Sequence, residues 1–140
     1  MGEEIGMVDP DYSSISDYID VESLNAYKLL LAQGCTEKEA FRRIKAKSRD
    51  NSRTPMQWSD AEQAGFTTGK PWLKVAGKLE EINVEKERSS EDSILSYYKK
   101  LIWLRKTYPI VAQGDYHAYG ADHRKFMAIF ANLKGSSYLY

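Results

Sequence analysis

The chain has 140 residues and a mass of 16.0 kDa, enough for one ordinary domain with a single hydrophobic core. Hydrophobic residues make up 42% of the sequence, which excludes general disorder. The 20 basic residues balance the 20 acidic ones, so the composition gives no electrostatic footprint for nucleic acid or an anionic membrane. No apolar run is long enough to span a membrane, and the acidic N-terminus does not resemble a secretory signal, so we predict a soluble, cytoplasmic protein.

The first part of the chain predicts a helical hairpin. Residues 1–7 are too short for an independent strand and are interpreted as the end of a strand or a tight turn. Residues 21–33 carry apolar side chains at helical spacing, and Gly34 stands where a left-handed C-terminal cap belongs. Thr36 is expected to open a second helix, because Glu39 follows three residues later and the two fit a capping box. The side chains expected to face the core are Leu24, Tyr27, Leu30 and Leu31 in the first helix, and Ala40, Phe41 and Ile44 in the second.

The middle of the chain predicts a long irregular loop and then a third helix. Residues 49–71 are polar and interrupted by Gly and Pro, and a loop of this length in a compact domain is usually functional. Residues 90–108 predict a helix that Ser90 caps and Pro109 ends. Residues 79–86 alternate only weakly in polarity and support no assignment.

The tail predicts short β-strands at residues 110–112, 115–119, 126–133 and 137–140. Three or four short strands make a marginal sheet unless another layer covers them. We therefore expect the sequence to stop inside a β domain, and we expect an α+β arrangement overall.

The segment from Arg49 to Trp58 is the most informative stretch for function. It combines Arg, Asp, Asn, Ser, Gln and Trp, which offer planar donors and acceptors for sugar hydroxyls and an aromatic face for a pyranose ring. Within it, Arg53 supplies a fixed fork of donors that never loses its charge. The alternative interpretation is a structural loop held by Asp–Arg pairs under a tryptophan plug.

Other candidate residues favour plainer interpretations. Glu3 and Glu4 would point to opposite faces if they lie on a strand, so they cannot flank one bond together, and a solvated acidic terminus is favoured. His117 and His123 have no partner at metal-ligand spacing and are expected at the surface. Cys35 is the one cysteine, so it forms no internal disulfide and is expected to be structural. We predict neither a metal site nor a cofactor.

Several motifs follow one another in a fixed order: Gly2-Glu3-Glu4-Ile5-Gly6-Met7, Asp20-Val21-Glu22-Ser23-Leu24-Asn25, Lys47-Ser48-Arg49-Asp50-Asn51-Ser52-Arg53-Thr54-Pro55-Met56-Gln57-Trp58, Ala64-Gly65-Phe66-Thr67-Thr68-Gly69 with Pro71-Trp72, and Ile82-Asn83-Val84-Glu85. This series strongly resembles the α-glucosidases of glycoside hydrolase family 13, a group that includes oligo-1,6-glucosidases and trehalose-6-phosphate hydrolases. The resemblance runs from residue 2 to the neighbourhood of residue 116. With Ser48, Asn51 and Ser52, the loop looks closest to the trehalose-6-phosphate hydrolases.

The resemblance implies a (β/α)8 barrel followed by an antiparallel β domain, of which this chain would be a C-terminal fragment. Residues 1–108 would be the C-terminal part of the barrel. Within them, residues 2–7 would end strand eight, the helical hairpin and long loop would form an excursion, and residues 91–108 would be helix eight. Residues 109–140 would begin the β domain, which would be truncated.

The resemblance also implies a retaining glycosidase, whose nucleophile, general acid/base and third aspartate come from strands four, five and seven. Those strands would precede this chain, so no residue here receives a catalytic role and the fragment alone is expected to be inactive. What carries over is substrate binding. Arg53 matches the arginine that helps to hold the non-reducing-end glucose, Glu3 and Glu4 would lie near the pocket rim, and Asp50 and Trp58 would support the loop.

The predicted function is therefore hydrolysis, by the parent enzyme, of terminal α-glucosidic bonds in trehalose 6-phosphate or isomalto-oligosaccharides. Its partner would be a glucose-containing small sugar, with no nucleic acid and no membrane. The alternative is a stand-alone carbohydrate-binding or protein-interaction module without catalysis. Helix eight would lack its barrel neighbours, so its apolar face, which includes Ile94, Leu101 and Ile102, is expected to self-associate or repack.

Overall fold

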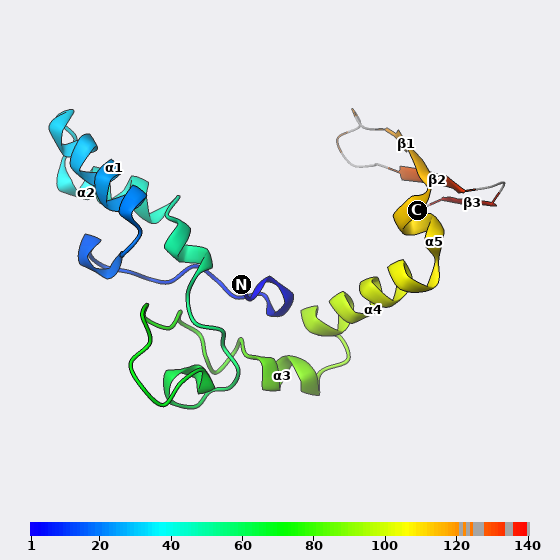
Figure 1. The fold of residues 1–140 in the computed structure, drawn as a ribbon, viewed down its shortest axis with the longest axis horizontal. Helices are drawn as coiled ribbons and strands as arrows, with labels where there is room; N and C mark the ends of the chain where they lie inside the picture. Colours follow the sequence, from blue (N-terminus) through cyan, green and yellow to red (C-terminus); the bar gives the residue numbers. More distant parts are fainter. Residues whose placement is uncertain (121, 123, 125–127, 134–135, 140) are drawn as a thin grey trace. The chain divides into compact units, whose positions relative to one another are not determined.

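A computed structural model of the chain describes residues 1–120, 122, 124, 128–133 and 136–139. The chain forms two compact units, residues 1–96 and residues 97–140. Helices and turns make up the first unit, and helices followed by an antiparallel sheet make up the second, in agreement with the predicted mixture of elements (Figure 1). Within the described ranges, none of the helices has the length and apolar character needed to cross a membrane.

The predicted helical hairpin is confirmed. Helix α1 spans Val21–Ala32 and helix α2 spans Glu37–Lys45, and the two lie side by side (Figure 1). Between them Gly34 has a φ of 87°, the left-handed conformation predicted for the end of the first helix. Cys35 follows as a partly buried free thiol in the same connection.

The start of α2 shows half of the predicted capping box. The side-chain oxygen of Thr36 accepts a hydrogen bond from the backbone N–H of Glu39 at 3.3 Å, as predicted. The carboxylate of Glu39 does not return the bond, because it pairs with Arg43 one turn later at 3.0 Å.

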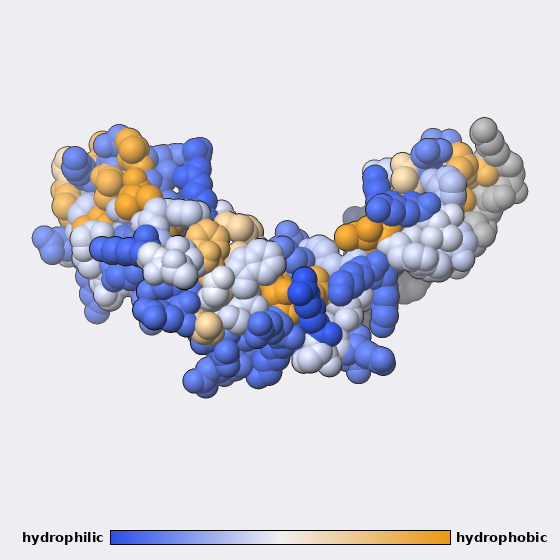
Figure 2. All heavy atoms as spheres, turned by 60° about the horizontal axis from the view of Figure 1, so that its bottom comes forward, coloured by the Kyte–Doolittle hydropathy of each residue, from blue (hydrophilic) through white to orange (hydrophobic). Residues whose placement is uncertain are grey.

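A small core holds the hairpin to the preceding segment. It is built on Tyr12, Tyr18 and Ile44, and the partly buried side chains packed against it are Ile15, Ala26, Tyr27, Leu30 and Phe41. Ser14 caps the short helix η2, Ile15–Asp17, between the two tyrosines, whose rings meet edge to face at 5.0 Å. In α2 the predicted stripe is confirmed, whereas in α1 the stripe is shifted, and Leu24 and Leu31 lie outside this cluster. Apolar residues also remain at the surface of the hairpin (Figure 2), and Leu29 of α1 is 59% exposed.

Tyr18 carries a polar atom that the hairpin core does not satisfy. Its hydroxyl is buried and has no hydrogen-bond partner among the described residues. We expect Tyr18→Phe to raise the free energy of unfolding by about 1 kcal/mol, because it removes an unpaired buried hydroxyl without leaving a cavity. Thermal unfolding measures this change, and Tyr12→Phe is the control, since that hydroxyl donates to the Lys74 carbonyl at 3.4 Å. A clear loss of stability in Tyr18→Phe would contradict the prediction.

Tyr12 makes the hairpin core sensitive to alkaline pH. Burial, and secondly the charge of Asp50, raise the pKa of Tyr12 from 10.0 to about 12. Because the pKa is higher in the folded state, the stability that it contributes is fully present below pH 10 and is lost as the pH rises towards 12. Absorbance titration of tyrosinate, taken as the difference between the native chain and Tyr12→Phe, should report this late ionisation. Ionisation near pH 10 in the folded chain would refute it.

A second core joins the N-terminus of the first unit to segments far along the chain. Ile5, Met56 and Val84 are buried together, and Met7, Phe66, Ile82 and Leu95 pack against them. The motif-bearing N-terminus, the long loop and the start of the following helices therefore share one hydrophobic cluster.

The N-terminal motif forms a tight turn. Helix η1, Glu3–Ile5, is a single 3-10 turn between Gly2 and Gly6, whose φ angles are 87° and 68°. Both glycines lie in the left-handed region, which a strand cannot contain. Of the two interpretations made from the sequence, the tight turn is correct and the strand end is wrong.

The long loop is irregular, as predicted, and short helical turns punctuate it. Helix η3 spans Arg49–Ser52 and helix η4 spans Glu62–Gly65. Residues 79–86, for which the sequence supported no assignment, include the start of a short helix, α3, Val84–Ser89. Gln57 is fully buried between these parts, where its Nε2 donates to the Gly77 carbonyl and its backbone carbonyl accepts from Val84.

Helix η4 contains a turn of the opposite hand. Gln63, Ala64 and Gly65 have φ angles of 51°, 60° and 64°. Ala64 is fully buried, and its carbonyl accepts from the backbone N–H groups of Trp58 at 2.9 Å and Ser59 at 3.2 Å. Burial and these two bonds offset the steric cost of the left-handed conformation, which is about 1–2 kcal/mol per non-glycine residue.

The third predicted helix begins later than expected. Helix α4 spans Ile94–Thr107, and the hydroxyl of Ser93 accepts from the Ser96 N–H at 3.1 Å at its start. Ser90 was expected to cap this helix, but it is the C-terminal cap of α3. The two helices are separated because Ser93 also donates to the Glu87 carbonyl at 2.7 Å, which turns the chain before α4.

The predicted strand at residues 110–112 is wrong. Pro109 stands at the first position of a short helix, α5, Pro109–Gln113. Proline suits this position because its fixed φ fits a helix and its missing N–H would have had no partner there. Ile110 of α5 is buried and α5 packs on the sheet, where Ala128 and Ala131 are buried.

The tail forms a three-stranded antiparallel sheet in the order β1-β2-β3. Its strands are β1, Asp115–Tyr119, β2, Ala128–Leu133, and β3, Ser136–Leu139. The strand predicted at 115–119 is confirmed, and those at 126–133 and 137–140 are confirmed over their described residues. Residues 126, 127 and 140, together with His123, lie outside the described residues, whereas His117 is exposed on β1.

Candidate functional site

The side chain of Arg53 projects from the end of a 3-10 turn. Its backbone N–H closes η3 by donating to the Asp50 carbonyl at 3.0 Å. The Arg53 side chain is 53% exposed, and its Nη1 lies 3.6 Å from Oδ1 of Asp20. One edge of the guanidinium is thus held by a carboxylate, and more than half of the side chain remains accessible to a ligand.

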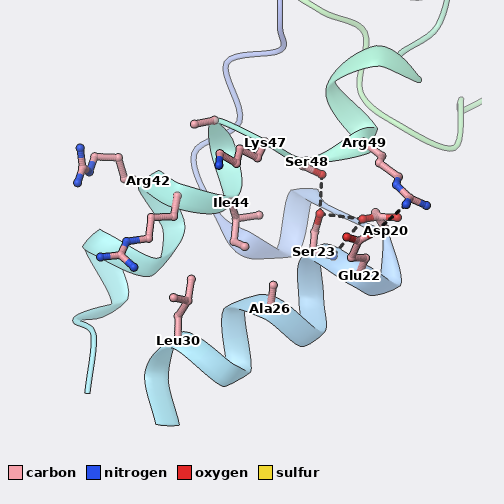
Figure 3. A pocket seen from close by; sticks show the side chains of 12 residues that line it. Asp20, Glu22, Ser23, Ala26, Leu30, Arg42, Ile44, Lys47, Ser48 and Arg49 are labelled. Carbon is pink, nitrogen blue, oxygen red and sulfur yellow. Dashed lines mark hydrogen bonds and ion pairs between the residues drawn. The ribbon is translucent and has the colours of Figure 1, made fainter. Parts of the chain in front are cut away.

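The carboxylate that faces Arg53 is itself fixed. Oδ2 of Asp20 accepts from the Ser23 hydroxyl at 2.8 Å and from the Ser23 backbone N–H at 3.0 Å, which makes Asp20 the N-cap of α1. The Ser23 hydroxyl is also joined to that of Ser48 at 2.8 Å (Figure 3). The hydrogen bond from Ser23, together with the charges of Arg53 and Arg49, holds the pKa of Asp20 below its ordinary 3.8, so Asp20 faces Arg53 as an anion.

Asp50 holds the loop against the chain before α1. It is 1% exposed, and its Oδ2 accepts from the backbone N–H groups of Ile19 at 2.8 Å and Asp20 at 2.9 Å. Arg53 does pair with an aspartate, but that aspartate is Asp20, outside the loop, whereas Asp50 accepts only backbone hydrogen bonds. Trp58 is 47% exposed and therefore does not plug the loop.

Glu3 and Glu4 lie on η1, which follows a residue that contacts the start of the same loop. The terminal amine of Met1 donates to the Ser52 carbonyl at 3.1 Å, which brings η1 beside the residue preceding Arg53. Glu3 is exposed and Glu4 is half-buried, and neither forms an ion pair with any residue that the structure describes. Of the four residues predicted for this site, Asp50 is buried against the backbone, and Glu3 and Glu4 form no ion pair within the described residues. Arg53 alone of the four is both exposed and paired with an opposite charge.

Sequence reasoning missed the role of Asp20. The residue belongs to one of the quoted motifs, and its position immediately before an apolar-periodic helix is the signal of an N-cap. Its second role, holding Arg53 from far along the chain, has no local signal, because it depends on Asp50 pinning the Asp20 backbone. No group of three His, Cys, Asp or Glu side chains that could hold a metal ion occurs in the part of the chain that the structure describes.

Comparison with known proteins identifies the family. The family described as alpha amylase, catalytic domain, matches residues 1–114. The chain belongs to this family of glycoside hydrolases, as the motifs predicted.

Two groups of characterised relatives are similar over most of the chain. The trehalose-6-phosphate hydrolase of Bacillus subtilis (strain 168) is 46% identical over 136 residues, which are 97% of this chain and 24% of the relative. The oligo-1,6-glucosidase of Bacillus cereus is 49% identical over 116 residues, which are 82% of this chain and 21% of the relative. The chain thus spans about a quarter of the length of the curated relatives that it matches.

Solved structures of related proteins superpose closely on this chain. The trehalose-6-phosphate hydrolase of Bacillus licheniformis superposes with a TM-score of 0.86 at 48% identity, over 94% of this chain and 24% of that one. The trehalulose synthase of Pseudomonas mesoacidophila MX-45 superposes with a TM-score of 0.93 at 35% identity, over 99% of this chain and 25% of that one. The fold described above is therefore one that this family uses.

Proposed function

We propose that this chain is one part of a retaining α-glucosidase, to which it contributes a sugar-holding arginine, Arg53. The whole enzyme would hydrolyse terminal α-glucosidic bonds in small sugars, either trehalose 6-phosphate or isomalto-oligosaccharides. Residues 1–108 would be the C-terminal part of its (β/α)8 barrel, and residues 109–140 would be the start of its antiparallel β domain. The relatives' names and the share of their length that the chain covers support this assignment.

The observation that carries the proposal is the presentation of Arg53. An ionised Asp20 steadies one edge of its guanidinium, while the rest of the side chain remains accessible. A charged donor fork held in this way can donate to two hydroxyls of one glucose ring, and it has less side-chain entropy to lose on binding than a free arginine. Loops that follow barrel strands form the active-site face of such enzymes, and the Arg53 loop would be one of them.

We further propose that the chain alone has no hydrolytic activity. A retaining glycosidase needs two carboxyl groups about 5–5.5 Å apart around the scissile bond. The hairpin pocket described below contains two carboxylates, but both are engaged, Asp20 by Ser23 and Glu22 by Arg49. Incubation of the chain with trehalose 6-phosphate, isomaltose and p-nitrophenyl α-glucoside should give no turnover above the blank.

A chimera tests the role of Arg53 in hydrolysis. The 136 residues of the Bacillus subtilis trehalose-6-phosphate hydrolase that match this chain would be replaced by it. We expect the chimera to hydrolyse trehalose 6-phosphate, and Arg53→Ala to lower kcat/KM by roughly tenfold to a hundredfold, the usual cost of a lost charged hydrogen bond. Lys70→Ala, an exposed change in the same long loop, is the control. Equal activity of the two variants would refute the assigned role.

The second candidate function is a stand-alone carbohydrate-binding module. The exposure of Trp58 and Trp72, 47% and 57%, favours it, because exposed tryptophans commonly stack on sugar rings. Titration of the chain with isomalto-oligosaccharides, followed by tryptophan fluorescence, distinguishes the binding module from a part of a hydrolase. Saturable binding that Trp58→Ala or Trp72→Ala abolishes and that Arg53→Ala leaves intact, in a chain without turnover, would favour the binding module.

The apolar face of α4 supports a proposal about assembly. Ile94, Leu101 and Ile102, the three residues named for this face, are 45%, 43% and 51% exposed. Exposed apolar surface of this kind is usually covered in solution. We expect the isolated chain to self-associate through this face, as sedimentation velocity would detect, and Ile102→Lys to favour the monomer. A monodisperse native monomer would instead indicate that the face is covered by repacking.

A further inference from the structure

A pocket of about 520 Å³ lies inside the helical hairpin, apart from Arg53. It is lined by residues of α1, of α2 and of the segment that joins α2 to η3. Figure 3 shows Ala26 and Leu30 on α1 facing Ile44 on α2, so the interior between the helices is apolar. The volume falls within the usual range for pockets that bind small organic molecules, about 300–1,000 Å³.

The polar lining of this pocket is dominated by cations. Four basic side chains line it, Arg42, Arg43, Lys47 and Arg49, against two carboxylates, Asp20 and Glu22. Arg49 pairs with Glu22 at 2.9 Å, and Arg43 pairs with Glu39 at 3.0 Å (the former is drawn in Figure 3). The Asp20 carboxylate accepts a hydrogen bond from the Ser23 hydroxyl.

Two of these cations are left without a counter-charge. Arg42 and Lys47 form no ion pair with any residue in the described part of the chain. Both are exposed at the pocket. An arginine fork binds a carboxylate or phosphate through two parallel bonds, and a lysine adds a compact charge beside it. The chemistry that matches this lining is one anionic head group on an apolar body.

We propose that the hairpin pocket binds a small organic anion, either a carboxylate or a phosphate monoester, with its charge between Arg42 and Lys47 and its apolar body against Ala26, Leu30 and Ile44. This site is distinct from the proposed sugar contact at Arg53, which does not line the pocket. It goes beyond hydrolysis, because Arg42 and Lys47 take no part in the role given to Arg53, although Asp20 lies beside both sites.

Isothermal titration calorimetry on the full chain tests the proposal with four probes. Hexanoate and hexyl phosphate carry both required features, whereas hexanamide lacks the charge and inorganic phosphate lacks the apolar body. We expect at least one of the first two to bind saturably and roughly tenfold more tightly than either incomplete probe, as expected for charge-assisted hydrogen bonds. Which of the two binds more tightly identifies the head group.

Paired variants locate the binding. The double variant Arg42→Gln with Lys47→Gln should weaken binding of the preferred probe at least tenfold. The matched control is Lys28→Gln with Lys38→Gln, which removes two exposed cations of the same helices that do not line the pocket. Circular dichroism verifies that both variants keep the helices. The absence of saturable binding, equal binding of an incomplete probe, or equal binding by the two double variants would each overturn the proposal.

Discussion

Replacing Asp50 by Ala is expected to lower the free energy of unfolding of the first unit by about 3 kcal/mol, more than any other change to a polar residue proposed here. The carboxylate is almost completely buried and accepts the backbone N–H groups of Ile19 and Asp20. Without it, both donors lose their partner away from water. Urea unfolding followed by circular dichroism measures the loss.

The control for this variant is Asp60→Ala, which removes an exposed aspartate from the same long loop. Its effect on the free energy of unfolding should be below about 0.5 kcal/mol. The Asp50 variant should also release Asp20, whose backbone it pins, and so increase the mobility of Arg53. Similar stabilities for the two variants would mean that solvent satisfies the freed backbone groups.

Ile5→Ala is expected to cost about 3 kcal/mol in the free energy of unfolding, within the range for large-to-small changes in a core. Ile5 is 1% exposed and packs with Met56 and Val84. The change leaves a cavity where the N-terminal turn, the long loop and the start of α3 meet. The measurement is the same urea titration.

Ile19→Ala is the matched control, because Ile19 is 53% exposed and lies outside both hydrophobic clusters. It should change the free energy of unfolding by less than about 0.5 kcal/mol. If Ile5→Ala were as mild as this control, the N-terminal turn would not be an integral part of the first unit. In the chimera, Ile5→Ala should then leave the function of the Arg53 loop unchanged.

The helical hairpin could be predicted from sequence because its signals are local. Gly34 and Thr36 act within one turn of their own positions, through a left-handed φ and a side-chain cap. Pro109 misled the prediction for the opposite reason. Proline ends one helix and opens another equally well, and only the packing of Ile110 on the sheet decides that the next residues are helical.

The candidate site likewise has some features that the local sequence predicts and others that depend on tertiary contacts. The residue types around Arg53 indicated sugar binding, and the family motifs located the residue, since both are properties of the sequence itself. The pairing of Arg53 with Asp20 could not be predicted, because it depends on tertiary contacts between segments on either side of the hairpin. The hairpin pocket could not be predicted for a related reason: Arg42 lies in the basic last turn of α2 and Lys47 just beyond it, and only the fold places both in the lining of a pocket with apolar residues of α1.

The left-handed turn at residues 63–65 has a consequence for the order of folding. An isolated peptide of residues 57–66 contains the two N–H donors that the Ala64 carbonyl accepts, but it cannot bury Ala64, so the left-handed conformation is less favourable there than in the folded chain. The turn becomes favourable once Ala64 is buried and its carbonyl receives both N–H groups from the Trp58 side. We therefore expect this part of the loop to acquire its shape late, once the segments that bury Ala64 have assembled, and Trp58 to lack a defined orientation until then.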